Sequence, residues 1–133
     1  MATPLAPEPA WITRQMLDGI HGALLTQYGG VFGTANAAGI DAVLAHSRES
    51  PAADIATHAA SLGLALLRAH GYRDGNKRSA FAALATFLAL NGQRLDAPEA
   101  EVVPAMVLLA VGTLSETAFA IWIRAHMAPS AAA

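Results

Sequence analysis

A polar stretch near the middle of the chain, residues 70–79, carries side chains suited to chemistry on phosphate groups. It reads HGYRDGNKRS and begins with His70, a residue type that gains and loses a proton near neutral pH. Asp74 adds a hard carboxylate oxygen of the kind that binds magnesium. Lys77 and Arg78 add two positive charges, and the planar guanidinium of arginine can hold two phosphate oxygens. A histidine, a carboxylate, an amide and a Lys-Arg pair on one short turn are the parts that phosphate chemistry needs.

Two apolar segments flank this stretch and predict the helices that position it. Residues 54–69 and 80–90 place apolar side chains at helical spacing, and Asn91-Gly92 ends the second segment. The polar stretch is therefore a tight link between two buried helices, and its second half opens the second helix. A helix start presents unpaired N–H groups and the positive end of the helix dipole, which suits an anion such as phosphate. Four of the eight basic residues lie within eleven positions here: Arg68, Arg73, Lys77 and Arg78.

A purely structural interpretation of these residues is also open. Asp74 can cap the helix, Gly75 can ease the turn, and His70 can be a hydrogen-bonded structural histidine. Lys77 and Arg78 would then be solvated charges at the helix end where the dipole disfavours cations. Because that interpretation leaves a cationic cluster without a purpose, we favour a functional site.

The stretch resembles the signature His-x-Phe-x-(Asp/Asn)-(Gly/Ala)-Asn-Lys-Arg of Doc, the death-on-curing toxins within the Fic fold. Tyr72 occupies the aromatic position and is expected to point into the core. Other short segments agree with that family: Ile20-His21, Tyr28-Gly29-Gly30, Phe87-Leu88 and Asn91-Gly92. The resemblance runs over about residues 12–127. It implies an all-α fold, a compact helical bundle in which the active-site turn leads into a central helix.

The resemblance also implies a role for each residue of the turn. His70 is the general base toward a substrate hydroxyl, and Asp74 holds Mg²⁺. The phosphates of ATP are bound by the residues that open the helix, through backbone N–H groups and side chains: Gly75, Asn76, Lys77 and Arg78. The implied catalytic set is His70, Asp74, Lys77 and Arg78.

Lys77 bears on the type of reaction. Fic nucleotidyltransferases resemble this chain but place glycine at that position, whereas Doc proteins place lysine there and phosphorylate a protein hydroxyl with ATP. The resemblance therefore implies the toxin of a type II toxin–antitoxin system, acting as a protein Ser/Thr kinase that inhibits translation. The family's target is elongation factor Tu, and its inhibitor is a Phd-type antitoxin that folds along a groove of the toxin.

Two alternatives stay open. A Fic-type protein adenylyltransferase would transfer AMP, and a catalytically weak module would keep the helical scaffold only to bind an antitoxin. The intact His70, Asp74 and Arg78 oppose the second alternative. Gly71 stands where relatives usually carry proline or a larger apolar residue. We expect it to loosen the backbone beside His70 and to lower activity without abolishing it.

Composition restricts other function classes. A net charge of −2 gives no general affinity for nucleic acid or anionic membranes, and the absence of cysteine excludes disulfides and thiolate metal sites. No histidine spacing suggests a zinc site. Although 54% of the residues are hydrophobic, the longest apolar stretches, residues 80–90 and 102–114, are shorter than the roughly 20 residues that span a bilayer. We expect a cytoplasmic protein with an exposed apolar groove, which usually marks a partner site.

The chain is expected to form one domain of six or seven helices without strands. Residues 1–10 are predicted to be a disordered Pro/Ala arm, residues 11–128 the helical domain, and residues 129–133 a flexible tail. Thr13 is the expected cap of the first helix, on whose apolar face His21 has a buried structural role.

Punctuation residues predict the remaining boundaries. The glycine-rich residues 30–39 form a loop, and residues 47–51 close a short helix that follows it. A start signal at residues 96–99 opens the next helix, in which Pro104 marks a kink or a late start. A capping box at residues 113–116 opens the last helix.

Overall fold

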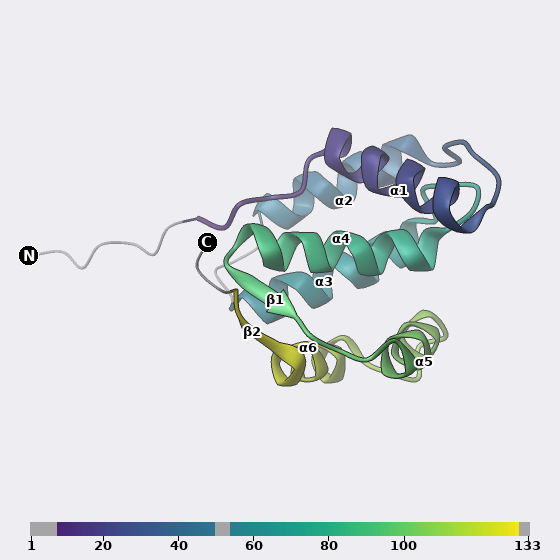
Figure 1. The fold of residues 1–133 in the computed structure, drawn as a ribbon. Helices are drawn as coiled ribbons and strands as arrows, with labels where there is room; N and C mark the ends of the chain where they lie inside the picture. The colour runs from purple at the N-terminus through teal and green to yellow at the C-terminus, as the bar shows by residue number, and fades with distance from the viewer. Residues whose placement is uncertain (1–7, 50–53, 131–133) are drawn as a thin grey trace, which may run out of the picture.

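The computed structural model describes residues 8–49 and 54–130. Within these residues the chain forms helices and short strands in this order: α1 (Arg14–Tyr28), α2 (Ala37–Glu49), α3 (Ile55–Ala69), α4 (Asn76–Leu90), β1 (Gln93–Leu95), α5 (Glu99–Ala110), α6 (Glu116–His126) and β2 (Met127–Pro129). Figure 1 shows α3 and α4 in the middle of the molecule, with α1 and α2 on one side and α5, α6 and the strands on the other. The predicted helical bundle is confirmed, with six helices in the described part of the chain.

The core is centred on α3 and α4, because these two helices pack against each other and against the helices on either side. Gly63 of α3 permits their close approach, since a Cβ there would lie 2.6 Å from Cδ2 of Leu84. The largest fully buried side chains come from the five helices other than α3: Phe87, Phe119, Leu17, Ile40, Leu84, Leu88, Leu109 and Ile123. Burial of a side chain of this size contributes about 1.5–3 kcal/mol. The turn between α3 and α4 thus joins the two helices at the centre of the core.

Polar side chains cap α1, α3 and α6, and one of the predicted caps is corrected. Thr13 caps α1 as predicted, and Asp54 caps α3 in the same way. The cap of α6 is Ser115, and the prediction that the capping box begins at Thr113 is wrong. A capping hydroxyl must lie directly before the first helical residue, here Glu116, to reach the unpaired N–H groups of the first turn.

The start of α5 differs from the prediction. The helix begins at Glu99 directly after Pro98, and no side chain caps it. Asp96, the first residue of the predicted start signal, lies before the helix, and its backbone N–H donates to the carbonyl of His126 at 2.8 Å. Pro104 lies inside the helix, so the late start predicted as one possibility is wrong.

Two short strands contradict the expectation of a fold without strands. β1 pairs with β2 in antiparallel orientation, with Arg94 opposite Ala128. Segments of three residues are too short to show the alternation of apolar and polar side chains that predicts a strand. The pairing joins the chain after α6 to the segment that follows α4.

Hydrogen bonds to Asn91 and Gly92 hold both ends of the described chain. The N–H of Ala10 donates to Oδ1 of Asn91 at 2.8 Å, and Nδ2 of Asn91 donates back to the carbonyl of Ala10 at 2.9 Å. The N–H of Ser130 donates to the carbonyl of Gly92 at 2.9 Å. Both ends therefore meet the turn that ends α4.

Parts of the predicted arm, tail and connecting turn lie outside the described residues. These parts are residues 1–7, 131–133 and 50–51. The predicted turn would begin at Ser47, but α2 continues to Glu49. Among the described helices none is long and apolar enough to span a bilayer.

Candidate active site

His70 ends α3 in a left-handed backbone conformation, with φ of 45° and ψ of 51°. It is the only non-glycine residue with positive φ in the described part of the chain. This conformation costs an L-residue about 1–2 kcal/mol, so the surrounding structure must hold it in place. The reversal of the chain leaves the imidazole exposed at the wall of a cavity.

Gly71 is held firmly, contrary to the expectation that it loosens the backbone. Its carbonyl accepts the N–H groups of Ala35 at 2.8 Å and Asn36 at 3.0 Å. A Cβ at this position would overlap the side chain of Ile40 in α2. Ile40 therefore fills the space that a larger residue at position 71 would occupy, and the backbone beside His70 is packed and hydrogen-bonded.

Asn36 connects the loop after α1 to the end of α3. Its Nδ2 donates to the carbonyl of Ala69 at 3.0 Å, and its Oδ1 accepts the N–H of Gly39 at 3.0 Å. The side chain thus serves both the start of α2 and the end of α3, immediately before His70. The predicted loop at residues 30–39 ends at this residue, because α2 begins at Ala37.

The Asp74 carboxylate is oriented by two backbone N–H groups. Oδ2 accepts the N–H of Val31 at 3.1 Å, and Oδ1 accepts the N–H of Gly75 at 2.9 Å. A Cβ at Gly30 would lie 2.8 Å from Oδ2, so the loop can come this close to the carboxylate because position 30 is a glycine. The cap of α4 is Gly75, in the left-handed region with φ of 75°, and no side chain caps this helix. The alternative in which Asp74 caps α4 is therefore wrong.

The Asn76 side chain closes the turn on itself. Its Oδ1 accepts the N–H of Tyr72 at 3.0 Å, and its Nδ2 donates to the carbonyl of Tyr72 at 2.8 Å. This pair of hydrogen bonds fixes the backbone between His70 and Asp74. The geometry gives the Asn76 amide a structural role in addition to its place at the cavity wall.

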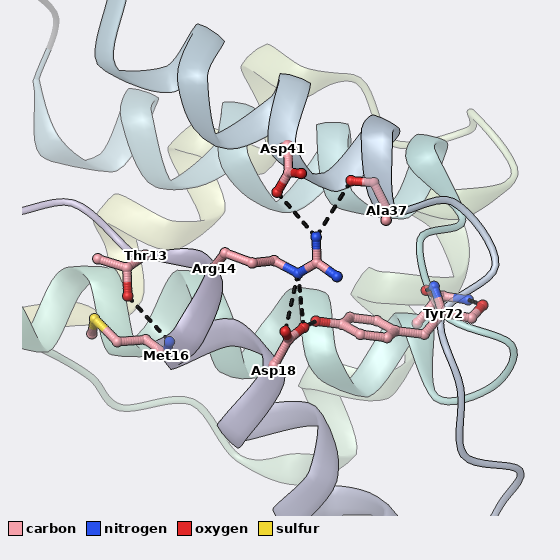
Figure 2. Close-up of polar contacts among 8 residues, drawn as sticks. Thr13, Arg14, Met16, Asp18, Ala37, Asp41 and Tyr72 are labelled. Atoms are coloured by element: carbon pink, nitrogen blue, oxygen red, sulfur yellow. Dashed lines mark hydrogen bonds and ion pairs between the residues drawn. The ribbon is translucent and has the colours of Figure 1, made fainter.

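A polar network anchors the turn to α1 and α2 (Figure 2). The Tyr72 hydroxyl donates to Oδ1 of Asp18 at 2.6 Å, and Nε of Arg14 donates to both oxygens of that carboxylate at 2.9 and 3.1 Å. The Arg14 guanidinium also donates to Asp41 of α2 at 3.0 Å. Burial and the hydrogen bond to Asp18 raise the pKa of Tyr72 well above its usual value, so it stays a donor. Although burial acts in the opposite direction, the hydrogen bonds from Tyr72 and Arg14 lower the pKa of Asp18.

His21 of α1 packs against the turn and supports it. It is buried, as predicted, and its ring stacks on Tyr72 with the centroids 3.7 Å apart and the planes 8° from parallel. Its Nε2 lies 2.8 Å from the carbonyl oxygen of Asp74, to which it donates in the matching tautomer. Tyr72 is buried too, as predicted. Sequence patterns indicated the burial of His21 but not its contact with the turn, and they did not reveal Asp18, which lies one helical turn before His21.

All six residues predicted from the turn line one cavity of about 920 Å³: His70, Asp74, Gly75, Asn76, Lys77 and Arg78. The cavity lies between the end of α1, the start of α4 and one face of α5. Lys77 and Arg78 are exposed, and no carboxylate within residues 8–49 or 54–130 forms an ion pair with either side chain. The guanidinium of Arg78 lies over the ring of Tyr28, 4.4 Å from its centroid. Unpaired cations beside the positive end of a helix dipole create a site for an anion.

An apolar stripe on α5 forms the opposite wall of the cavity. Its residues are Val103 and Val107 of α5 and Val111, which directly follows the last residue of the helix; they are spaced four residues apart and are 57%, 43% and 70% exposed. Side chains at this spacing share one face of a helix. These exposed valines, beside the polar turn, correspond to the exposed apolar groove that the sequence predicted.

His126 ties this α5 wall to α6. Its Nδ1 lies 2.7 Å from the carbonyl oxygen of Trp122, and its Nε2 lies 2.8 Å from Oε2 of Glu101. Both partners are acceptors, so both ring nitrogens donate only when the imidazole is protonated. The hydrogen bond to Trp122 raises the pKa of His126; desolvation opposes this shift, while Glu101 and Asp96 add to it.

The stability contributed by His126 is expected to fall as the pH rises. Because the folded-state pKa is raised above 6.5, the contribution is complete below the unfolded-state pKa and is lost as the pH passes through the folded-state value. Thermal unfolding of wild type and His126→Gln, measured from about pH 6 to about pH 9, should show a stability difference that shrinks at high pH. A difference that is constant or grows with pH would contradict the assignment.

The donor set fits magnesium that is bound together with phosphate. Asp74 presents its carboxylate to the cavity, and each of its oxygens accepts one hydrogen bond and keeps a further lone pair. In the described part of the chain no three His, Asp or Glu side chains gather into a metal site of their own. Magnesium commonly uses one or two protein carboxylates and takes its other ligands from phosphate and water. Asp74 would therefore hold the ion only as part of a complex with a phosphate ligand.

Comparison with known protein families identifies the family of this chain. The model of the Fic/DOC family matches residues 11–88, which is more than half of the chain and includes the whole turn between α3 and α4. A search of curated proteins found no match. The chain therefore belongs to the Fic/DOC family, whose members are typically transferases that use a nucleotide with a metal ion.

Proposed function

We propose that this protein is the toxin of a toxin–antitoxin system and a kinase that transfers the γ-phosphoryl group of ATP to a Ser or Thr hydroxyl of elongation factor Tu. The observation that carries the proposal is the meeting of three features in one cavity. These are the exposed His70, the start of α4 without a side-chain cap, and the cations Lys77 and Arg78, which have no acidic partner among the described residues. A target in the translation machinery places the protein in the cytoplasm.

Each residue of the turn has its own role in the proposed reaction. The substrate hydroxyl oxygen forms a bond to the γ-phosphorus, its proton passes to the His70 imidazole, and the bond between the γ-phosphorus and the bridging oxygen of ADP breaks. Lys77, Arg78 and the free N–H groups at the start of α4 hold the phosphates and neutralise the charge that develops on them. Asp74 would hold the magnesium ion, which would supply positive charge to the phosphates when bound. Such transfer depends mainly on positioning, and the network around Tyr72 holds the turn in place for it.

The side chain of Lys77 supports γ-phosphoryl transfer over AMP transfer. It lines the cavity next to the open helix start. Glycine at this position would let a phosphate reach the N–H groups directly, with the α-phosphate at the reacting centre. A lysine occupies part of that space and adds charge, which favours the reversed orientation of ATP. AMP transfer is the second candidate, because the uncapped N–H groups of α4 remain able to receive an α-phosphate. ATP labelled at one phosphate or the other separates the two reactions.

The apolar stripe of Val103, Val107 and Val111 is the proposed docking surface for the partner, a Phd-like antitoxin. An amphipathic helix from such a partner can bury valines spaced four residues apart, and it would lie directly beside the catalytic turn. Occupation of the cavity would then block the ATP site.

Binding of a Phd-type antitoxin is expected to raise the thermal stability of the toxin through mass action. Val107→Asp should weaken this effect, because it buries a charge in the interface. Ile121→Asp is the matched control, since Ile121 is exposed on α6 and does not line the cavity. The melting temperature at saturating antitoxin measures both. An unchanged melting temperature, or an equal loss for the two variants, would contradict this surface.

A further inference from the structure

Tyr28 and Arg78 form a contact between α1 and α4 at the mouth of the cavity. Tyr28 is the last residue of α1, is 52% exposed, and is one of the residues that line the cavity. Arg78 lies in the first turn of α4, and its Cζ is 4.4 Å from the centroid of the Tyr28 ring. The two helices pack against each other, which brings the end of α1 beside the start of α4.

Other arginines of the chain form ion pairs with carboxylates. Arg14 is bound by Asp18 and Asp41, and Arg124 donates to Asp54 at 2.6 Å. These arginines join helices and are committed to their partners. Arg78 differs, because its partner in the described chain is an aromatic face.

An aromatic partner has a different consequence from a carboxylate. A carboxylate neutralises the guanidinium and accepts its N–H groups, so fewer donors remain for a ligand. A ring face attracts the cation but carries no opposite charge and no oxygen acceptor. Arg78 is thus restrained in position while its charge and its donors stay available to an anion in the cavity.

We propose that Tyr28 is a positioning residue that holds the Arg78 guanidinium ready for the phosphate groups of the nucleotide. This inference rests on the proposed function, since it assigns the ligand of Arg78 as a polyphosphate. Tyr28 acts through Arg78 and makes no contact with the reacting atoms.

The test measures the binding of two probes, Mg-ATP and magnesium triphosphate, by titration calorimetry. The variants are Tyr28→Phe, Tyr28→Leu, Arg78→Gln and the double variant Tyr28→Leu/Arg78→Gln. A cation–π contact at an exposed site corresponds to about a two- to fivefold change in affinity. We expect Tyr28→Leu to weaken both probes by that factor and Tyr28→Phe to bind like wild type. In the Arg78→Gln background, Tyr28→Leu should have no further effect. Circular dichroism and thermal unfolding confirm that each variant is folded.

The binding results distinguish the positioning role of Tyr28 from the proposed nucleotide site. If wild type binds both probes and Tyr28→Leu binds them equally well, the role of Tyr28 is overturned while the nucleotide site stands. A loss of affinity for Mg-ATP alone would mean that Tyr28 stacks on the base, and it would overturn the positioning role. An equal loss on Tyr28→Leu substitution in the Arg78→Gln background would overturn that role as well. If wild type binds neither probe, the proposed kinase function and this inference both fail.

Discussion

Replacement of His70 by asparagine is expected to lower the rate of phosphoryl transfer about 10²–10⁴-fold, the usual cost of losing a general base. The imidazole is exposed at the cavity wall and has no hydrogen-bond partner in the described chain, so it is available to a substrate hydroxyl. Growth inhibition on expression of the protein should disappear with the activity.

Asparagine is the suitable substitute because His70 has a left-handed backbone conformation. Asparagine tolerates that conformation, whereas alanine adds strain. His70→Asn should therefore unfold at the wild-type temperature, and His70→Ala should be less stable and equally inactive. A folded His70→Asn variant that retains full activity and toxicity would show that the histidine is structural.

Replacement of Arg78 by glutamine is expected to reduce transfer about 10²–10³-fold, the cost of removing one preorganised group that stabilises transition-state charge. Arg78 lies in the first turn of α4, where the helix dipole disfavours a cation, and no acidic side chain in the part of the chain that the structure describes pairs with it. Removal of its charge relieves the unfavourable interaction with the dipole and also loses the contact with Tyr28, so stability should be nearly unchanged. Rate loss without loss of stability is the signature of a ligand-binding cation.

Arg48→Gln is the matched control for Arg78→Gln. Arg48 is an exposed arginine near the end of α2 and does not line the cavity, so the same change in charge should leave the rate unaffected. Steady-state rates with Mg-ATP and the protein substrate measure both variants. Equal rates for Arg78→Gln and wild type, or equal losses for the two variants, would remove Arg78 from the site.

The residues of the turn could be recognised in the sequence because they are consecutive. One decapeptide holds the candidate base, the carboxylate and the cations, and apolar spacing on either side predicts the helices that carry it. The residues that orient the turn could not be found in this way. Asp18 meets Tyr72 across 54 positions, and Val31 meets Asp74 across 43. Such partners are set by how α1 packs against α4, which no local pattern records.

Gly71 illustrates how a local interpretation is changed by packing. By itself, glycine beside the base suggests a loose backbone. In the fold its missing side chain is compensated by Ile40, and its carbonyl is bound by two N–H groups of the loop before α2. The two short strands were missed for a related reason, since their pairing depends on where α6 ends relative to α4.

The central claim is that the γ-phosphoryl group of ATP is transferred to a protein. Incubation of the protein and elongation factor Tu with ATP labelled at the γ-phosphate, or in parallel at the α-phosphate, tests it most directly. We expect label on elongation factor Tu from γ-labelled ATP alone, and none with His70→Asn. Lys77→Gly should shift the transfer toward the α-phosphate if the lysine side chain sets the orientation of ATP. Label from α-labelled ATP with the wild-type protein would mean AMP transfer and would contradict the kinase assignment.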